Sequence, residues 1–141
     1  MSIEKIYGIA GTALNAQLTR MNATASNLAN AGTTAATEKE AYRGKRTVFK
    51  ALMDEEMIHA GAPYIGGVKV DKIVDDTKPV PRVYDPNNPL ADADGFVFQS
   101  NVNEVTEMVD MMAASRSYQN NVEVVNTARE LMMRSLEIIK A

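Results

Sequence analysis

The 141-residue sequence has no cysteine, no tryptophan and a single histidine. Without cysteine, a disulfide framework, a cysteine-ligated zinc site, an iron–sulfur cluster and a thiol nucleophile are all excluded. No apolar run approaches the ~18 residues that a transmembrane helix needs. The formal net charge of −3 argues against a general nucleic-acid-binding protein. Glu4 and Lys5 interrupt the beginning of the chain, so we expect no cleaved secretory signal.

Helix-breaking residues are unevenly distributed. All five prolines lie between residues 63 and 89, and neither proline nor glycine occurs from Phe96 to Ala141. This distribution predicts an α+β fold, in which long N- and C-terminal helices form a coiled-coil-like pair and the middle segment is small and β-rich. The predicted layout is an N-terminal helix over 1–31, a loop or linker over 32–63, a β-rich domain over 64–100 and a C-terminal helix over 101–141.

Apolar residues recur at heptad spacing in both predicted helices, which is typical of coiled-coil-like packing. A single helix pair would leave one flank of each helix exposed, so we expect further helix–helix association with other subunits. The positions predicted to pack are Tyr7, Leu14, Met21 and Leu28 in the N-terminal helix, and Met108, Met111, Tyr118, Val122, Val125, Met132, Leu136 and Ile139 in the C-terminal helix.

Two residues are predicted to end these helices. Asn101 stands three residues before Glu104, so we expect Asn101 to cap the start of the C-terminal helix. Gly32 follows Ala31, and we expect it to stop the N-terminal helix in the left-handed conformation.

No catalytic, cofactor-binding or metal-binding site is predicted. His59 has no second histidine or cysteine to complete a zinc site, and a Ser–His–Asp triad would depend on this residue alone. Asp75 and Asp76 are adjacent carboxylates near a lysine and a proline, a pattern typical of an exposed loop. Three functions are considered for this chain: an assembly subunit, a soluble adaptor and an enzyme. An enzyme that uses His59 or the Asp75–Asp76 pair is the weakest of them.

Three stretches carry a family resemblance. Asn22–Ala31 (NATASNLANA) resembles the N-terminal motif of bacterial flagellar rod and hook proteins. Val83–Gly95 (VYDPNNPLADADG) and Asn101–Met112 (NVNEVTEMVDMM) are similar to proximal-rod members of this axial protein family, and Tyr84–Gly95 distinguishes the chain from the paralogous rod subunit FlgB. The residues that carry the family motif are Ser26, Asn27, Asn30, Tyr84, Asp85, Pro86, Asn88 and Pro89.

The resemblance implies a structural subunit of the flagellar basal body that builds the proximal rod of the drive shaft by helix–helix polymerisation. It implies no enzymatic activity and no cofactor. The implied partners are further copies, other rod subunits such as FlgB and FlgF, the rod-junction protein FliE, the membrane ring and the flagellar type III export apparatus, and not nucleic acid. The implied location is the periplasmic rod of the basal body, reached without a cleaved signal peptide.

Phe49 and Met53 match the spacing of an export-gate cue that several exported rod and hook proteins carry. An ordinary strand or helix face explains the same spacing. The remaining alternative to an assembly subunit is a soluble adaptor or chaperone that captures helices in a groove. Such an adaptor would be a stable folded monomer or dimer with ordered ends in isolation.

Overall fold

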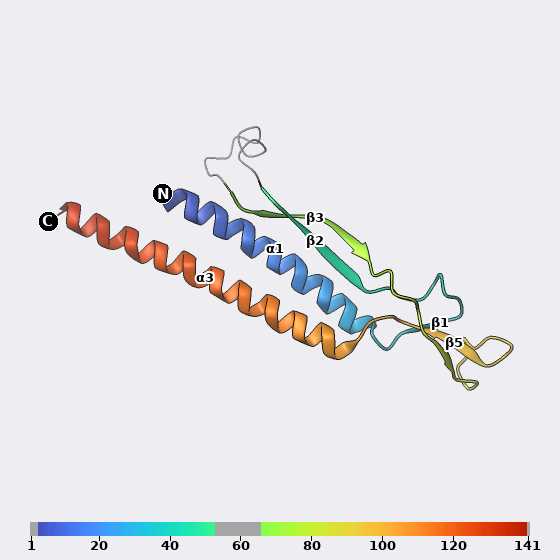
Figure 1. The fold of residues 1–141 in the computed structure, drawn as a ribbon. Coiled ribbons are helices and arrows are strands. Elements are labelled where there is room, and N and C mark those ends of the chain that lie inside the picture. Colours follow the sequence, from blue (N-terminus) through green and yellow to red (C-terminus); the bar gives the residue numbers. More distant parts are fainter. Residues whose placement is uncertain (1–2, 53–65, 141) are drawn as a thin grey trace. The chain divides into compact units, whose positions relative to one another are not determined.

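The computed structural model describes residues 3–52 and 66–140 (Figure 1). Two long helices dominate it, α1 (Ile3–Asn30) and α3 (Glu104–Lys140). Between them lie five strands: β1 (Thr34–Ala35), β2 (Lys45–Ala51), β3 (Val68–Asp75), β4 (Arg82–Tyr84) and β5 (Phe96–Gln99). The predicted α+β class, with paired terminal helices and a small β-rich middle, is confirmed.

The segment 32–63, assigned above to a loop or linker, contains β1 and β2. The sequence of β2 is KRTVFKA, in which the β-formers Thr47, Val48 and Phe49 are flanked by lysine and arginine. The alternation of apolar and polar residues in this segment is too weak to predict a strand. Pairing with β3 in a two-stranded sheet stabilises β2 as a strand.

Among the described residues, no helix has the length and apolar character needed to cross a membrane.

Contacts divide the chain into two compact units, and both long helices and the β2–β3 pair contribute residues to each. Unit 1 comprises Met1–Thr19, Val48–Lys72 and Ala113–Ala141. Unit 2 comprises Arg20–Thr47 and Ile73–Met112.

In unit 1, the most buried helix residues are small. Ala10 and Ala16 of α1 and Ala114 and Ala128 of α3 are almost fully enclosed. Small side chains let helix backbones approach closely, so the contact depends on close approach more than on large apolar side chains. The β2–β3 pair is attached to α1 where the backbone N–H of Val68 donates to Oγ1 of Thr12 (3.2 Å).

Unit 2 contains a three-stranded antiparallel sheet in the order β1-β5-β4. Thr34 is opposite Gln99 across the β1–β5 pair, and Val83 is opposite Val97 across the β4–β5 pair. Val97 is fully buried. The side-chain hydroxyl of Ser100, just after β5, donates to the carbonyl of Ala31 (2.7 Å) and ties the sheet to the end of α1.

Both predicted helix ends differ from the structure in detail. Asn103, not Asn101, caps α3, because its Oδ1 accepts the backbone N–H of Thr106 (2.9 Å). Asn101 instead accepts the N–H of Gly44 (2.8 Å) and donates to the carbonyl of Lys78 (2.9 Å), so it fastens two loops. The prediction for Gly32 was wrong, because its φ is not positive. The described glycines with positive φ are Gly66, Gly67 and Gly95.

The end of α1 needs no left-handed residue because side-chain and turn hydrogen bonds satisfy its last carbonyls. Oγ1 of Thr33 donates to the carbonyl of Asn30 (2.7 Å), and the N–H of Thr33 reaches the same oxygen (3.2 Å). A short turn at residues 31 and 32 follows the helix.

Gly95 is required by the turn between β4 and β5. Its φ is +81°, and a β-carbon built on it would lie 2.9 Å from Cε2 of Tyr84 and 3.2 Å from Cβ of Pro86. The turn is closed by the N–H of Asp85 bonding to the carbonyl of Gly95 (2.9 Å). Any side chain here meets both backbone strain and a steric clash.

We expect Gly95→Ala to lower the free energy of unfolding by about 1–2 kcal/mol, the cost of a left-handed L-residue. Gly32→Ala is the matched control, because its added β-carbon meets nothing within 4 Å and its φ lies outside the left-handed region. Urea unfolding of the two variants measures the difference. Equal stabilities for both variants would contradict the assigned role of Gly95.

Candidate assembly surfaces

A buried polar cluster joins three elements within unit 2. It consists of Asn27 near the end of α1, Arg46 in β2 and Glu107 in the first turn of α3. The Asn27 and Glu107 residues are 0% and 1% exposed, among the most enclosed of the described chain. Buried side chains of these types must satisfy their polar atoms internally, so their partners define the geometry.

Asn27 uses both ends of its amide. Its Nδ2 donates to the carbonyl of Lys45 (2.9 Å) and to Oε2 of Glu107 (2.8 Å). Its Oδ1 accepts the backbone N–H of Lys45 (2.7 Å) and the hydroxyl of Tyr42 (3.1 Å). One side chain therefore replaces a strand partner for Lys45 and also binds the neighbouring helix.

Glu107 is balanced by the guanidinium of Arg46. Nη1 of Arg46 lies 2.8 Å from Oε1 of Glu107. No hydrogen bond of good geometry reaches Oε1, so this contact is an attraction between charges and not a directional bond. The Arg46 side chain is 36% exposed whereas that of Glu107 is 1% exposed. The cation thus lies at the edge of the cluster, and the carboxylate lies inside it.

Further charged groups surround Arg46. Asp110 of α3 lies 3.5 Å from Nη1 of Arg46 and accepts a hydrogen bond from Arg20 of α1 (3.1 Å). Asp76 lies 3.4 Å from the guanidinium on the opposite side. The backbone N–H of Lys78 bonds to Asp76 and, with Arg46, holds the pKa of the Asp76 carboxyl below its usual value against the opposing effect of burial.

The motif residues of α1 lie at and around this cluster. Ser26 shares a hydrogen bond with the hydroxyl of Tyr42 (3.1 Å), which itself donates to Asn27. Asn30 only donates back to the carbonyl of Ser26 within the helix (2.8 Å). Of the three motif residues in α1, Asn27 is therefore the one whose side chain hydrogen-bonds to residues of other elements, Lys45 of β2 and Glu107 of α3.

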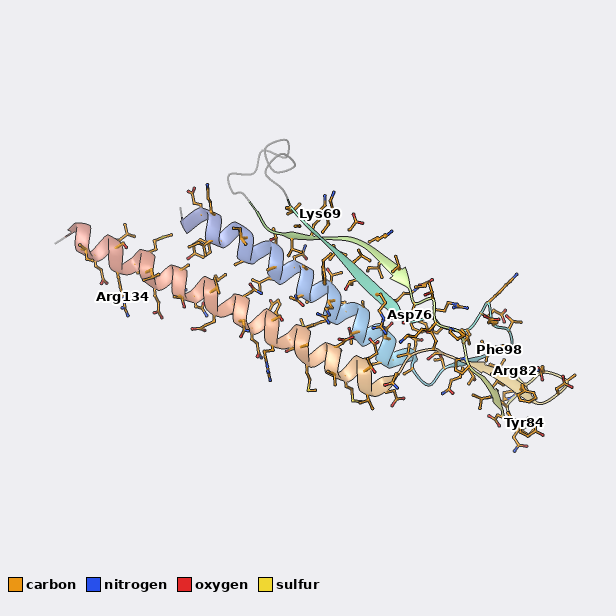
Figure 2. All side chains as sticks on the ribbon, viewed as in Figure 1. Lys69, Asp76, Arg82, Tyr84, Phe98 and Arg134 are labelled. Atoms are coloured by element: carbon orange, nitrogen blue, oxygen red, sulfur yellow. The ribbon has the colours of Figure 1, made fainter. Side chains whose placement is uncertain are left out.

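The remaining motif residues form the exposed β4–β5 hairpin, where Figure 2 shows Arg82 and Tyr84. Tyr84 is 64% exposed and meets Phe96 edge to face (5.2 Å between ring centroids), and Arg82 lies 4.3 Å from the Phe96 ring centroid. Asn88 closes the loop, because its Nδ2 donates to Asp85 (3.3 Å) and its Oδ1 accepts the N–H of Leu90 (3.0 Å). Pro86 and Pro89 lie exposed in the same loop.

Asp92 organises the other half of this hairpin. Its carboxylate accepts the N–H groups of Phe96 (2.9 Å) and Asp94 (3.0 Å) and pairs with Arg82 (2.6 Å). The bond from Phe96, followed by the Arg82 bond, lowers the pKa of Asp92. The hairpin is held by its own hydrogen bonds, and side chains on it, including Tyr84 and Leu90, are exposed.

A continuous apolar stripe lies on the face of α3 away from Glu107. We call Val105, Met108, Val109 and Met112 the outer stripe; their exposures are 70%, 52%, 55% and 64%. Their spacing of three, four and seven residues places them on one helix face. A soluble helix normally turns polar side chains outward, so this apolar stripe is unusual for a helix surface exposed to water.

The structure places the predicted packing residues in three groups. Tyr7, Leu14, Met21, Leu28, Met111, Tyr118, Val125 and Met132 are half-buried, whereas Met108, Val122 and Leu136 are exposed. The side chain of Ile139 lies outside the described residues. Within the chain, the most buried α3 positions are Glu107, Ala114 and Ala128, which sequence analysis did not assign to the seam. Whether the exposed positions contact other subunits stays a prediction.

Two alternatives from the sequence can be located only in part. His59 and Met53 lie outside the described residues, while Phe49 is on β2 with its side chain exposed. Asp75 pairs with Lys45, whose pKa is raised by that bond, and Asp76 is held by Arg46 and Lys78. Over residues 3–52 and 66–140, no three potential metal-ligating acidic, histidine or cysteine side chains come together.

Comparison with known proteins identifies the family. A family model described as "Flagella basal body rod protein" matches residues 9–37, and one described as "Flagellar basal body rod FlgEFG protein C-terminal" matches residues 93–138. The chain is 44% identical to the flagellar basal-body rod protein FlgC of Salmonella typhimurium over 98% of both chains. It belongs to the FlgC family. Identity is 45% to FlgC of Escherichia coli O6:H1, again over 98% of both chains.

A more distant relative, FlgC of Bacillus subtilis, is 37% identical over 94% of this chain and 95% of its own. Membership of the FlgC family makes the chain a structural component of the flagellar basal-body rod, which assembles with other rod and basal-body components. The two matched ranges contain Asn27 and Glu107, whereas Arg46 and residues 82–92 lie outside both ranges. The resemblance found in the sequence is confirmed.

Proposed function

We propose that this FlgC-family chain builds the proximal rod by helix–helix polymerisation, in which the outer stripe of α3 packs against helices of neighbouring subunits. The carrying observation is the exposure of all four outer-stripe side chains on one helix face. An assembly subunit needs such a face uncovered in the single chain and covered in the polymer.

The energetics of the outer stripe suit polymerisation. Fully burying a valine or methionine side chain contributes roughly 1.5–3 kcal/mol relative to full exposure, and these four are more than half exposed. Even partial burial repeated in every subunit therefore gives a substantial association free energy. A rod that transmits torque benefits from many such shallow contacts, because no single contact must carry the load.

A second apolar surface in unit 1 supports the same proposal. A groove of about 450 Å³ is lined by Ile6 of α1 and by six residues of α3. Val124 and Leu131, seven residues apart, form its apolar α3 side. Such a groove along a helix fits an apolar ridge of another helix.

The proposed partners are further copies of this chain, rod subunits such as FlgB and FlgF, the rod-junction protein FliE and the membrane ring. We also propose delivery to the periplasmic rod by the flagellar type III export apparatus, with Phe49 and Met53 as an export cue. The β4–β5 hairpin is a further surface that neighbouring subunits could contact, because Tyr84 and Leu90 are exposed on it. The proposal assigns no catalytic role to any residue.

Met112→Asp tests the proposal. We expect this charge to remove the chain from basal bodies and to abolish swimming, because burying an unpaired carboxylate costs several kcal/mol. The measurement is the amount of the chain in purified basal bodies from a strain carrying only the variant, together with spreading in soft agar. Met112→Leu is the matched control, since it keeps an apolar side chain of similar volume.

Normal incorporation of Met112→Asp would contradict the proposal. A circular dichroism spectrum of the purified variant must match that of the parent, so that loss of assembly is separated from loss of folding. The adaptor alternative predicts a different distribution, in which the parent chain itself stays in the soluble fraction and is absent from basal bodies.

A further inference from the structure

We infer that the buried polar cluster of Asn27, Arg46 and Glu107 is a register lock, which fixes the position of α1 along α3 and holds the start of β2 against both helices. The inference concerns the internal order of a single chain and does not depend on polymerisation. All its residues belong to unit 2.

The first argument is that Asn27 can form all its hydrogen bonds at only one position of α1 relative to α3 and β2. Its amide binds both the N–H and the carbonyl of Lys45, and its Nδ2 also donates to Glu107. Sliding α1 by one turn (~5.4 Å) would carry the amide out of reach of all these groups. Each would then be buried without a partner, which is costly for enclosed polar atoms.

The second argument is that the surrounding apolar contacts do not specify a register. The other buried residues of α1 in this unit are Ala23 and Thr24, and the buried Ala31 directly follows the helix; all three are small. Small side chains at repeating positions pack almost as well after a slip of one turn. A buried polar residue that selects one register is the best-attested use of such groups.

The third argument is the charge arrangement around Arg46. The guanidinium faces Glu107 and Asp110 on α3 and Asp76 after β3, while Arg20 on α1 shares Asp110. Two carboxylates of α3 and one from the segment after β3 therefore face an arginine of β2 and an arginine of α1. Displacing α1 separates Arg20 from Asp110 and leaves the three carboxylates opposite Arg46 alone, so this charge arrangement disfavours other registers independently of Asn27.

The test measures the distance between α1 and α3 directly. Because the chain has no cysteine, Asn22→Cys and Val109→Cys, both at exposed positions in unit 2, add two specific spin-label sites. Pulsed electron paramagnetic resonance on the full chain should give one narrow distance. Adding Asn27→Leu, Arg46→Met and Glu107→Met should create a second distance population, because α1 can then slip along α3 by about one helical turn (~5.4 Å).

Arg43→Ala in the labelled chain is the matched control. It removes the exposed pair of Arg43 with Glu38, which does not join the two helices, and should leave the distance distribution unchanged. An unchanged single distance in the triple variant would overturn the register lock. So would a broad distribution in the parent chain, because the cluster would then fail to fix the register.

Loss of helical circular dichroism in the triple variant calls for a milder change. Glu107→Gln retains an oxygen that can accept from Asn27 but removes the charge opposite Arg46. The register lock predicts a broader distance distribution for this variant than for the Arg43→Ala control. Identical distributions for the two variants would overturn the inference.

Discussion

Arg46→Met should lower the free energy of unfolding by about 3 kcal/mol. The substitution leaves Glu107, 1% exposed, with its charge enclosed and without the guanidinium that lies 2.8 Å away. Breaking a buried ion pair from one side costs about 3–5 kcal/mol. We place the expected value at the lower end because water reaches the Arg46 side of the pair, which is 36% exposed.

Urea unfolding followed by circular dichroism measures this loss, and two further variants locate its cause. Arg46→Met combined with Glu107→Gln should recover most of the stability, because the uncompensated charge is then gone. Arg46→Lys should be intermediate, since a single ammonium cannot reach Glu107 and Asp76 with the fork geometry of arginine. A loss below about 1 kcal/mol in Arg46→Met, the size of a surface pair, would show that Glu107 is not enclosed as described.

The second large effect is expected at Asn27. Asn27→Ala removes both hydrogen bonds to the Lys45 backbone, the bond from Tyr42 and the bond to Glu107. Each buried group left without a partner costs about 1–3 kcal/mol, so we expect a total loss of about 3 kcal/mol or more. The amide hydrogen of Lys45, which donates to Asn27, should also exchange markedly faster with solvent.

Asn30→Ala is a matched control for Asn27→Ala in the same helix and the same family motif. Asn30 only donates to the carbonyl of Ser26, and alanine is the better helix former, so the expected change is within about 0.5 kcal/mol. The pair separates the structural role of one asparagine from a general effect of the motif. Equal losses at the two positions would disprove the special role of Asn27.

The two long helices could be predicted from the sequence because their cause is local. The predicted ranges 1–31 and 101–141 became Ile3–Asn30 and Glu104–Lys140. Heptad spacing in both ranges, together with the lack of proline in both and of glycine in the C-terminal one, suffices for such elements. Their ends were less predictable, because Asn103 competes with Asn101 as a cap and Asn101 is used by the loops at Gly44 and Lys78.

The pairing of the two helices was predicted, but its most buried positions were not. Heptad reasoning selected large apolar positions such as Met108 and Leu136, which are exposed, whereas Ala114 and Ala128 are buried. Alanine carries a weak hydrophobic signal, so its role in close approach is visible only once the backbones are placed. Glu107, seven residues before Ala114, is also buried although it is charged, so a search for apolar positions does not select it.

The buried polar cluster was hidden for a different reason. Asn27 was identified only through the family resemblance, and its partners Arg46 and Glu107 are distant in sequence and of types usually found at the surface. No periodic pattern links three such residues. The basic residues of Lys45–Ala51 also masked β2, the strand that brings Arg46 to the cluster.

The most direct test of the proposed assembly is photocrosslinking from the outer stripe in intact basal bodies. A photoreactive amino acid at Met108 is expected to crosslink to other rod subunits in purified basal bodies, and mass spectrometry identifies the joined peptides. The same group at the buried Ala114 is the control and should give no crosslink between subunits. Absence of the parent chain from detergent-resistant basal bodies, or its presence there with Met108 uncrosslinked, would contradict polymerisation through this helix face.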